Sequence, residues 1–444
     1  MKIVRAKEIG AAAVEALLQK KAFDEVELNP KIREANRKLF GEDLTAAELV
    51  RRIVTDVREK GDSAVIEYTK LIDRVEYRPE DFLVSEAEYL EAERQADPQV
   101  LASLRRAAEN VRRYHQEQKP NSWMTYREHG SILGQSVIPL DRVGIYVPGG
   151  TAAYPSSVIM NAVPAAVAGV SEIIMMVPPK NGKINPYVLL AAREAGVDKI
   201  FKIGGAQAIA AMAFGTETIP RVDKITGPGN IFVTLAKKEV YGHCDIDMLA
   251  GPSEILIVAD ETADPVYTAA DMLSQAEHDP LACSIVITDS AELAEKIAKE
   301  AELQLAKLPR QEIAKASLDR NGLIVIAEDI RQAIEFANVS APEHMELLTR
   351  EPFQLLPYVR HAGAVFLGAY SPEPLGDYFA GPNHVLPTGG TARYYSVLNV
   401  ETFMKRTSII SYTQPALAAV SEDIIRLAET EGLDAHANAI RLRK

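Results

Sequence analysis

The segment SQAEHDP, residues 274–280, follows a run with helical periodicity and carries two side chains that can bind a metal ion. Gln275 and His278 are three residues apart, so on a helix both project from one face of a single turn. An amide oxygen and an imidazole nitrogen can be the first two ligands of a metal site. They can equally form a polar helix end, and their spacing alone leaves both interpretations open.

A second candidate is the segment APEHMELL, where Glu343 and His344 are adjacent. A carboxylate beside an imidazole is a plausible acid–base pair, because both groups can exchange protons near neutral pH. Adjacent residues do not share a helix face, so both reach one site only from a turn or irregular backbone. Pro342 favours such a turn. Taken alone, the motif fits a surface turn as well as a catalytic pair.

Two later segments carry further candidates. Asp377 and His384 lie in PLGDYFAGPNHVLPTGG, a long Gly- and Pro-rich stretch of the kind that is often functional in α/β proteins. Glu431 and His436 lie in EGLDAHANAIRLR, although a single histidine in a tail is usually just exposed. Two nitrogen donors and two hard oxygen donors suit Zn²⁺, and also Mn²⁺, Co²⁺ or Ni²⁺. One set of four residues supplies them: Gln275, His278, Asp377 and His436.

Three glycine turns end strand-like segments: Gly149-Gly150, Gly204-Gly205 and Gly227-Pro228-Gly229. Ligands of open parallel sheets bind at the carboxyl ends of the strands, where glycine permits close approach and a following helix offers free N–H groups. A single turn of this kind is ordinary chain geometry, but three together favour a nucleotide or phosphate site. Neither GxGxxG nor GxxxxGK[ST] occurs, so the standard dinucleotide fingerprint and the P-loop are absent.

The elements that must position these residues alternate between strand and helix. From residue 142 to 259 strand, glycine turn and helix repeat, and the alternation resumes through residue 326, which is typical of parallel sheets covered by helices on both faces. The first 118 residues read mostly as helices. The segment WMTYREHGSILGQSVIPL alternates on either side of His129-Gly130, which predicts a hairpin.

We therefore expect an α/β protein with two parallel-sheet domains, one inserted in the other. The predicted divisions are an N-terminal helical segment 1–41, a first domain formed by 42–142 and 255–398, an inserted domain 143–254 and a tail 399–444. The tail should contain one helix, PALAAVSEDIIRLAETEG, and a short terminal strand. It is too small for a core of its own, so it should pack on something else, and a second subunit is one candidate.

Composition narrows the function classes. The chain of 444 residues has a net charge of −13, which disfavours nucleic acid as a partner. No apolar run is long enough to span a membrane, and the N-terminal segment lacks a signal-peptide core, so we expect a cytoplasmic protein. The only cysteines, Cys244 and Cys283, exclude a disulfide framework, and no CxxC pair suggests a thiolate zinc site. Either could be a lone nucleophile, but their apolar surroundings favour buried structural thiols.

Eight blocks of this sequence resemble the L-histidinol dehydrogenase family, in that family's order from about residue 140 to the end. They are VGIYVPGGTAAYPSSVIMNAVPAAVAGV, GGAQAIAAMAFGTETIP, ITGPGNIFV, IDMLAGPSEILI, DMLSQAEHDP, SAPEHMELL, PLGDYFAGPNHVLPTGGTAR and EGLDAHANAIRLR. The helical N-terminal part is consistent with the family but less diagnostic. The resemblance implies two Rossmann-like, aldehyde-dehydrogenase-like domains, one inserted in the other.

The resemblance assigns roles to the candidates. It implies one Zn²⁺ per subunit held by Gln275, His278, Asp377 and His436, the last reaching the site from the other subunit of a domain-swapped homodimer. It makes Glu343 and His344 the proton acceptors. It implies NAD contacts at Tyr146, Gln207 and Asn230. The implied substrate contacts are Ser253, Gln275, His278, Glu343, His344, Asp377, His384, Glu431 and His436.

The implied reaction is the last step of histidine biosynthesis, oxidation of L-histidinol to L-histidine through the aldehyde, with four electrons passing to two NAD⁺. We expect His344 to take the alcohol proton and Glu343 to activate water for the second oxidation. Neither cysteine lies in a functional motif, so Cys244→Ala and Cys283→Ala should stay active. The alternatives are a related dehydrogenase of another small alcohol, such as a sulfonated diol, and a non-catalytic metal-binding or scaffold protein on the same fold.

Overall fold

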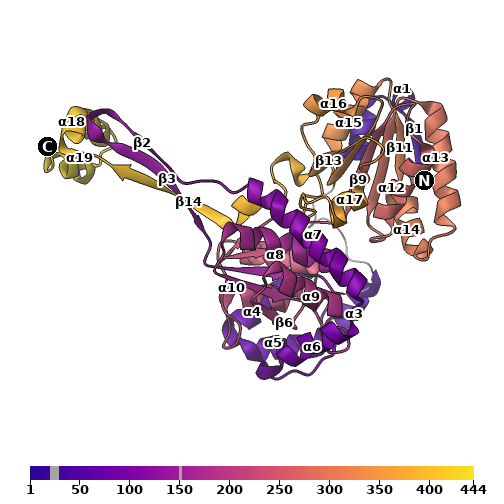
Figure 1. The fold of residues 1–444 in the computed structure, drawn as a ribbon, viewed down its shortest axis with the longest axis horizontal. Helices are drawn as coiled ribbons and strands as arrows, with labels where there is room; N and C mark the ends of the chain where they lie inside the picture. Colours follow the sequence, from indigo (N-terminus) through magenta and orange to yellow (C-terminus); the bar gives the residue numbers. More distant parts are fainter. Residues whose placement is uncertain (21–29, 150–152) are drawn as a thin grey trace.

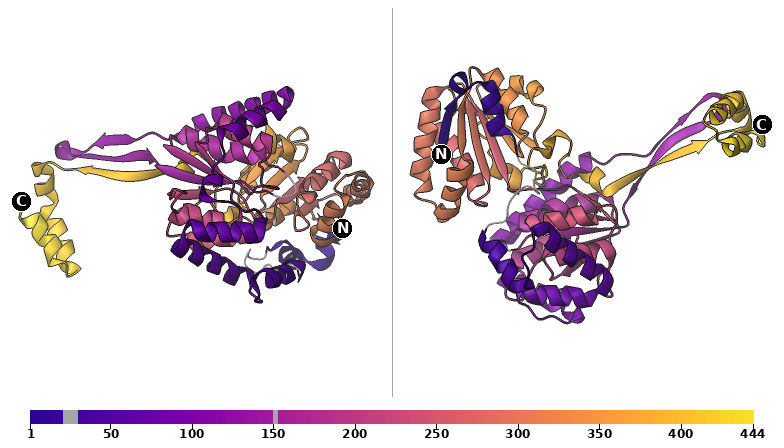
Figure 2. Two further views of the ribbon diagram at one scale, coloured as in Figure 1. Left: turned by 90° about the horizontal axis from the view of Figure 1, so that it is seen from below. Right: turned by 180° about the vertical axis from the view of Figure 1, so that it is seen from behind.

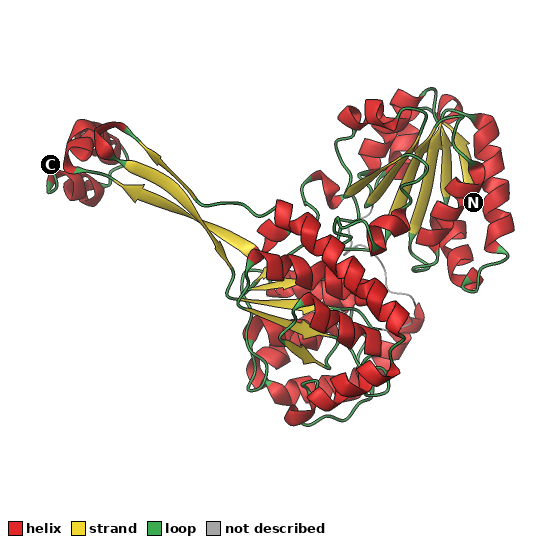
Figure 3. Ribbon diagram, viewed as in Figure 1, coloured by secondary structure: helices red, strands yellow, loops and turns green. Residues whose placement is uncertain are grey.

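Two parallel sheets and one long arm organise the chain in the computed structural model, which describes residues 1–20, 30–149 and 153–444 (Figures 1 and 3). Each sheet is covered by helices on both faces, and the arm extends away from both of these α/β units. The predicted fold class, two Rossmann-like parallel-sheet units, is confirmed. Within the described residues, no helix combines the length and the apolar character needed to cross a membrane.

The first unit is built on a five-stranded parallel sheet with the order β6-β5-β4-β7-β8. Its strands are β4 (Arg142–Tyr146), β5 (Glu172–Met176), β6 (Lys199–Phe201), β7 (Lys224–Thr226) and β8 (Asp245–Ile246). The helices between them are α8 (Pro155–Ala168), α9 (Pro186–Ala195), α10 (Gly205–Phe214) and α11 (Ile231–Val240). The four residues that follow Glu172 in β5 are all buried, as expected for a strand covered on both faces.

Helices from the N-terminal third complete this unit. They are α3 (Pro30–Phe40), α4 (Ala46–Lys60), α5 (Asp62–Tyr68), α6 (Glu86–Gln95) and α7 (Pro98–Glu117). Helix α4 begins with a capping box between Thr45 and Glu48, and its apolar face packs against α10 and α11. The sequence prediction groups segment 42–142 with 255–398, but its helices α4 to α7 bury their apolar faces on the five-stranded sheet.

The second unit has a six-stranded parallel sheet with the order β1-β11-β10-β9-β12-β13. Its strands are β1 (Lys2–Arg5), β9 (Glu254–Ala259), β10 (Cys283–Thr288), β11 (Leu323–Ile326), β12 (His344–Leu348) and β13 (Ala364–Leu367). Its helices are α1 (Ala6–Ile9), α2 (Ala11–Leu18), α12 (Pro265–Ala276), α13 (Ala291–Leu305), α14 (Gln311–Asn321), α15 (Ile330–Ser340), α16 (Pro352–Leu355) and α17 (Glu373–Tyr378).

The prediction of an N-terminal helical segment 1–41 is wrong at its start, because residues 2–5 form an edge strand of this second sheet, and residues 21–29 of that segment lie outside the described residues. Lys2 pairs with Leu323 and Arg5 with Ile326 in parallel register. A run of four residues is too short to show a strand period in the sequence, and only its pairing with β11 identifies it.

The arm is a three-stranded antiparallel sheet of β2 (Trp123–Tyr126), β3 (Ile132–Pro139) and β14 (Met404–Ser411). The predicted hairpin is confirmed, with both residues of its turn, His129 and Gly130, at positive φ. Helices α18 (Gln414–Thr430) and α19 (Asp434–Arg441) lie at the far end of the arm, well away from the sheets (Figures 1 and 2).

The helix predicted in the tail is α18, but the predicted terminal strand is wrong, because those residues form α19. Ala437 and Ile440 lie one helical turn apart and pack against Ile425 and Ala428 of α18. The tail therefore has a small core of its own, contrary to the expectation from its length. That the tail packs on a further partner stays a prediction.

Candidate active site

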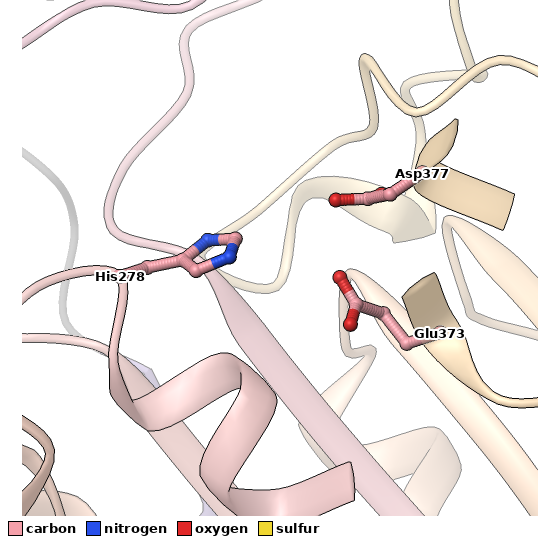
Figure 4. Close-up of side chains that lie close together, drawn as sticks. All are labelled: His278, Glu373 and Asp377. Carbon is pink, nitrogen blue, oxygen red and sulfur yellow. The ribbon is translucent and has the colours of Figure 1, made fainter. Parts of the chain in front are cut away.

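Three side chains converge where α12 and α17 meet (Figure 4). His278, Glu373 and Asp377 each offer a ligand atom, and these atoms lie within 4.8 Å of one another. Gln275 lies in the last turn of α12, fully buried, and both its Oε1 and Nε2 are without a hydrogen-bond partner. Buried polar atoms are normally paired, so this orphaned amide and the three adjacent donors fit a bound cation.

The direction of α12 explains why these ligands lie at the amino ends of the strands. Strand β9 runs away from Glu254, and α12 returns in the opposite sense, beginning at the N-cap Asp264 and ending before His278. Helix α17 lies beside the last turn of α12, and Ser274 Oγ donates a hydrogen bond to Glu373 Oε2 at 3.1 Å. The type and spacing of residues 275–278 are visible in the sequence, but this return of the helix to the amino edge is a property of the fold.

Glu343 and His344 lie at the same edge. Ala341 adopts a left-handed conformation at φ 46°, so the chain turns sharply at Pro342 before β12 begins at His344. Glu343 Oε2 accepts from the N–H of Glu254 at 2.8 Å, and His344 Nδ1 lies 2.9 Å from the carbonyl oxygen of Glu254. The expected turn is therefore present, and one residue of β9 orients both members of the pair.

The hydrogen bond at Nδ1 leaves His344 Nε2 available as a proton acceptor. That nitrogen is buried and without a partner, and it lies 3.9 Å from Asp377 Oδ1. Burial lowers the pKa of His344 to about 4, so its imidazole is neutral at neutral pH. Burial raises the pKa of Glu343 well above that of an ordinary carboxyl group. A base with a free nitrogen therefore stands beside the ligand cluster.

The carboxyl groups of the cluster are crowded in a poorly solvated place. Burial raises the pKa of Asp377 to about 6. Burial, with the neighbouring Asp377 charge, raises the pKa of Glu373 to about 8. Two adjacent carboxylates away from water repel each other, and a divalent cation would relieve that repulsion. The electrostatics of the cluster therefore fit a metal ion, as its geometry does.

His384 connects the cluster to the other α/β unit. Its Nδ1 lies 3.1 Å from the carbonyl oxygen of Asp377, and its Nε2 lies 3.4 Å from Oγ of Ser157 in the first turn of α8. A cavity of about 300 Å³ opens beside it, lined among others by His344, Phe366 and Asp377. This volume suits a small substrate. The site thus lies where the six-stranded unit meets the five-stranded one.

The structure does not bring all the predicted residues together within one chain. Glu431 and His436 belong to the exposed helical end of the arm, remote from His278 and Asp377 (Figures 1 and 2). Ser253 immediately precedes Glu254, the residue at the start of β9 that orients Glu343 and His344. Gln275, His278, Glu343, His344, Asp377 and His384 occupy the amino edge of the six-stranded sheet or its surroundings.

The residues expected to contact a dinucleotide lie at the carboxyl edge of the five-stranded sheet. Tyr146 ends β4, and its hydroxyl accepts from the N–H of Gly205 at 3.1 Å. Gln207 is buried in α10, with Oε1 unpartnered, and its Nε2 donates to Asp73 at 3.4 Å. Asn230 caps α11, because its side-chain oxygen accepts hydrogen bonds from two backbone N–H groups of that helix.

The glycine turns at this edge are required by close packing. A Cβ at Gly227, where φ is +112°, would lie 2.1 Å from the carbonyl oxygen of Tyr146. A Cβ at Gly149 would lie 2.5 Å from Cγ of Pro178. Gly150 lies outside the described residues. Strands β4 and β7 are the neighbours at which the strand order reverses, the usual ligand-binding position of such sheets.

Sequence reasoning missed Glu373, which belongs to the ligand cluster. The signal was present, because Glu373 precedes Asp377 by four residues and the two share a helix face. It also missed Ser157 and Asp73, which touch His384 and Gln207 from elements distant in sequence. Nothing in their local sequence marks these two residues, and only tertiary contacts reveal them.

Comparisons with known proteins identify the family of this chain. The family model described as histidinol dehydrogenase matches residues 37–444. The histidinol dehydrogenase of Heliobacterium mobile is 57% identical over 403 residues, which cover 90% of this chain and 94% of that protein. The histidinol dehydrogenase of Bacillus subtilis (strain 168) is 55% identical over 396 residues, covering 89% of this chain and 92% of its own.

A solved structure is also similar over the whole length. The crystal structure of histidinol dehydrogenase from Elizabethkingia anophelis superimposes with a TM-score of 0.90 at 34% identity, covering 100% of this chain and 98% of the other. Sequence, fold and the arrangement of titratable groups therefore agree, and this chain is an enzyme. It belongs to the histidinol dehydrogenase family.

Proposed function

We propose that this enzyme oxidises L-histidinol to L-histidine through L-histidinaldehyde, reducing two NAD⁺, with Zn²⁺ as a bound cofactor. The observation that carries this proposal is the free Nε2 of His344 beside the cluster of His278, Glu373 and Asp377, in a chain of this family. Oxidation of an alcohol needs a base near the hydroxyl group and a means of holding the substrate. Both are present in one poorly solvated place.

His344 is the proposed base of the first oxidation. Its ring is neutral, and the contact of Nδ1 with the Glu254 carbonyl keeps Nε2 turned towards the cavity. The alcohol proton passes to Nε2 as the substrate carbon loses hydride. General-base catalysis of this kind contributes about 10²–10⁴-fold to the rate.

Glu343 is the proposed base for the second oxidation. Its Oε2 is held by the Glu254 N–H and lies 3.6 Å from Nδ1 of His344. The carboxylate takes a proton from water as the water adds to the aldehyde, and protonated His344 returns its proton to the carbonyl oxygen, giving a gem-diol. His344, now neutral again, takes one hydroxyl proton of the gem-diol as hydride leaves for the second NAD⁺. This yields the carboxylic acid, which loses its proton to give the carboxylate product.

The residues proposed to hold Zn²⁺ are Gln275, His278 and Asp377, with His436 of the partner subunit. When bound, the ion supplies a fixed point for the imidazole nitrogen and the amine of histidinol. Glu373 is the neighbour of this set, and in the metal-free site burial and the Asp377 charge raise the pKa of its carboxyl group to about 8. Proximity and orientation of this kind are worth several kcal/mol.

The proposed dinucleotide contacts are Tyr146, Gln207 and Asn230. Tyr146 ends β4, Gln207 lies in the first turn of α10 and Asn230 caps α11, so all three lie at the carboxyl edge of the five-stranded sheet, beside helix N-termini that favour a pyrophosphate. NAD⁺ bound there supplies the hydride acceptor. Ser157 at the start of α8 touches His384, so this edge directly adjoins the substrate side of the site.

The arm supports a homodimer that exchanges its tails. It exposes large apolar side chains that a monomer would leave in water, including Trp123 (53% exposed), Met124 (62%) and Ile410 (73%). In the proposed dimer each arm lies on the partner subunit and brings Glu431 and His436 to the partner's site. Glu431 then contacts substrate, together with Ser253 and His384.

The test is the yield of NADH per L-histidinol consumed, with zinc-loaded and with chelator-treated enzyme. We expect two NADH per histidinol, loss of activity on chelation and recovery when Zn²⁺ is restored. A yield of one would mean that the aldehyde is released, and would remove the role given to Glu343. Activity that survives complete removal of metal would remove the role given to the ion.

A further inference from the structure

A lysine and a cysteine meet in the second α/β unit, on the side of β9 facing the N-terminal helices. Lys20 follows α2, and its Nζ lies 3.2 Å from Sγ of Cys283, the first residue of β10. The same nitrogen lies 3.8 Å from Oε1 of Glu254, which is paired with Cys283 in the β9–β10 register. The Lys20 and Glu254 side chains are 16% and 8% exposed, so the ion pair is largely withdrawn from water.

This pair is reachable by small molecules. A cavity of about 1140 Å³ is lined by Lys20, Glu254 and Cys283 among others. The Glu254 atom Oε2 is buried and has no hydrogen-bond partner, so the polar groups around the thiol are not fully satisfied. The second cysteine differs, because Cys244 is packed into the hydrophobic cluster between α4, α10 and α11.

We propose that Lys20 and Cys283 form a reversible covalent bond when the protein is oxidised by a hydroperoxide. The assigned reaction has two steps. The thiol and one hydroperoxide give a sulfenic acid, with water (or the alcohol of an organic peroxide) as the reduced product. The neutral amine of Lys20 then attacks that sulfur, a nitrogen–sulfur bond forms, and the sulfenic oxygen leaves as a second water.

The contact provides what the second step needs. Sulfenic acids condense with nitrogen nucleophiles that are already close, and here the nitrogen touches the sulfur without any movement of the backbone. The amine must lose its ammonium proton before it attacks, and the Glu254 carboxylate is placed to receive it. The net change is removal of two hydrogen atoms, which the hydroperoxide accepts.

The modification site adjoins the active site through a single residue. The backbone of Glu254 donates to Glu343 and contacts His344, whereas its side chain faces Lys20. The bond would convert the cation beside Glu254 into a neutral group and tether the segment after α2 to β10. The proposal rests on these contacts and does not depend on which substrate the enzyme oxidises.

The experiment treats the full-length protein with hydrogen peroxide, blocks remaining thiols by alkylation, and identifies linked peptides by mass spectrometry. We expect a species joining the peptides of Lys20 and Cys283, lighter than their sum by two hydrogen atoms. Fragmentation must place the bond on Lys20 and not on the adjacent Lys21. Treatment with dithiothreitol should separate the two peptides.

Two variants and one control sharpen the result. Lys20→Arg keeps the positive charge and Cys283→Ser keeps the side-chain size, and both should abolish the linked species. Cys244→Ala should form it like the unchanged protein. The proposal is overturned if Cys283 proceeds to sulfinic acid without a link, if the link contains an additional oxygen atom, or if it survives in Lys20→Arg on another lysine such as Lys2, which lines the same cavity.

Discussion

The two sheets share one topology and present their candidate functional residues at opposite edges. If β4 to β8 are numbered 1 to 5 in chain order, the strands of the five-stranded sheet lie side by side in the order 3-2-1-4-5. Strands β9 to β13, numbered in the same way, have the same order, and β1 is added beside β11. In the first sheet the candidate residues follow the carboxyl ends of the strands. In the second sheet Glu343 and His344 lie at the amino ends.

The difference follows from what each edge offers. The carboxyl edge supplies helix N-termini and glycine turns, which suit a phosphate but contain little that can accept a proton. The amino edge of the second sheet supplies imidazole and carboxyl groups, because α12 returns there and Pro342 turns the chain into β12. Contact between His384 and Ser157 joins the two edges, so a bound dinucleotide and a bound alcohol would face each other.

The largest expected effect is at His344. His344→Ala should lower kcat by about 10³-fold, because the alcohol proton loses its acceptor, while the Kd for NADH stays within twofold of the original value. Steady-state kinetics and NADH fluorescence measure the two quantities. A loss of NADH affinity as large as the loss of kcat would show that the two edges do not act separately.

Next comes Glu343→Gln, which keeps the shape of the side chain. It should slow oxidation of L-histidinaldehyde by about 10²-fold and leave the alcohol step nearly intact, so that NADH per histidinol falls from two towards one.

The same residue predicts a pH dependence. Burial raises the pKa of Glu343, and only its ionised form accepts a proton from water, so the aldehyde step should accelerate as pH rises and level off above that raised pKa. Rate profiles on the aldehyde measure this rise. It should be absent in Glu343→Gln, and an unchanged profile there would assign the titration to another group.

The arm gives the fourth prediction. His344→Ala and His436→Ala should each be nearly inactive alone, yet their co-expression should restore about a quarter of the original activity, because half of the dimers would contain one intact site of two. Activity per purified subunit is the measurement. Co-expressed subunits that stay inactive would show that His436 serves the site of its own chain.

The smallest expected effect concerns the glycine turns. Gly227→Ala should lower the free energy of unfolding by about 2 kcal/mol or more and weaken NADH binding, because its Cβ would meet the Tyr146 carbonyl. Gly182→Ala is the matched control, since Gly182 also has positive φ (+76°) but its Cβ would have nothing within 4 Å. It should cost only about 1 kcal/mol and leave NADH binding unchanged. Equal effects in both variants would assign the loss to backbone strain alone.

Much of the fold was predictable because its strands are long enough and apolar enough to be recognised. The hairpin about His129, strand β9 and helix α12 all follow from periodicity and turn residues. The N-terminal strand β1 was not predictable, because a run of four residues is identified as a strand only by its pairing with β11. Helix α19 was not predictable either, because a short amphipathic segment has no decisive period.

The candidate site was predictable to a similar degree. Adjacent Glu343 and His344, and the spacing of Gln275 and His278, carry their chemistry in the sequence itself. Glu373 could have been found from its spacing to Asp377. Ser157 could not, since it acquires its role only by touching His384 from another α/β unit.

The sequence by itself determined the fold class, the family resemblance and the kinds of side chain available for proton transfer and metal binding. These depend on periodicity, residue chemistry and local spacing, which are properties of the chain alone. Only the tertiary structure decided at which edge of each sheet the candidate residues lie, that Glu254 orients both Glu343 and His344, and that His436 lies far from His278 within one chain. Such relations depend on the return of helices across sheets and on the direction of an arm, and no local spacing encodes them.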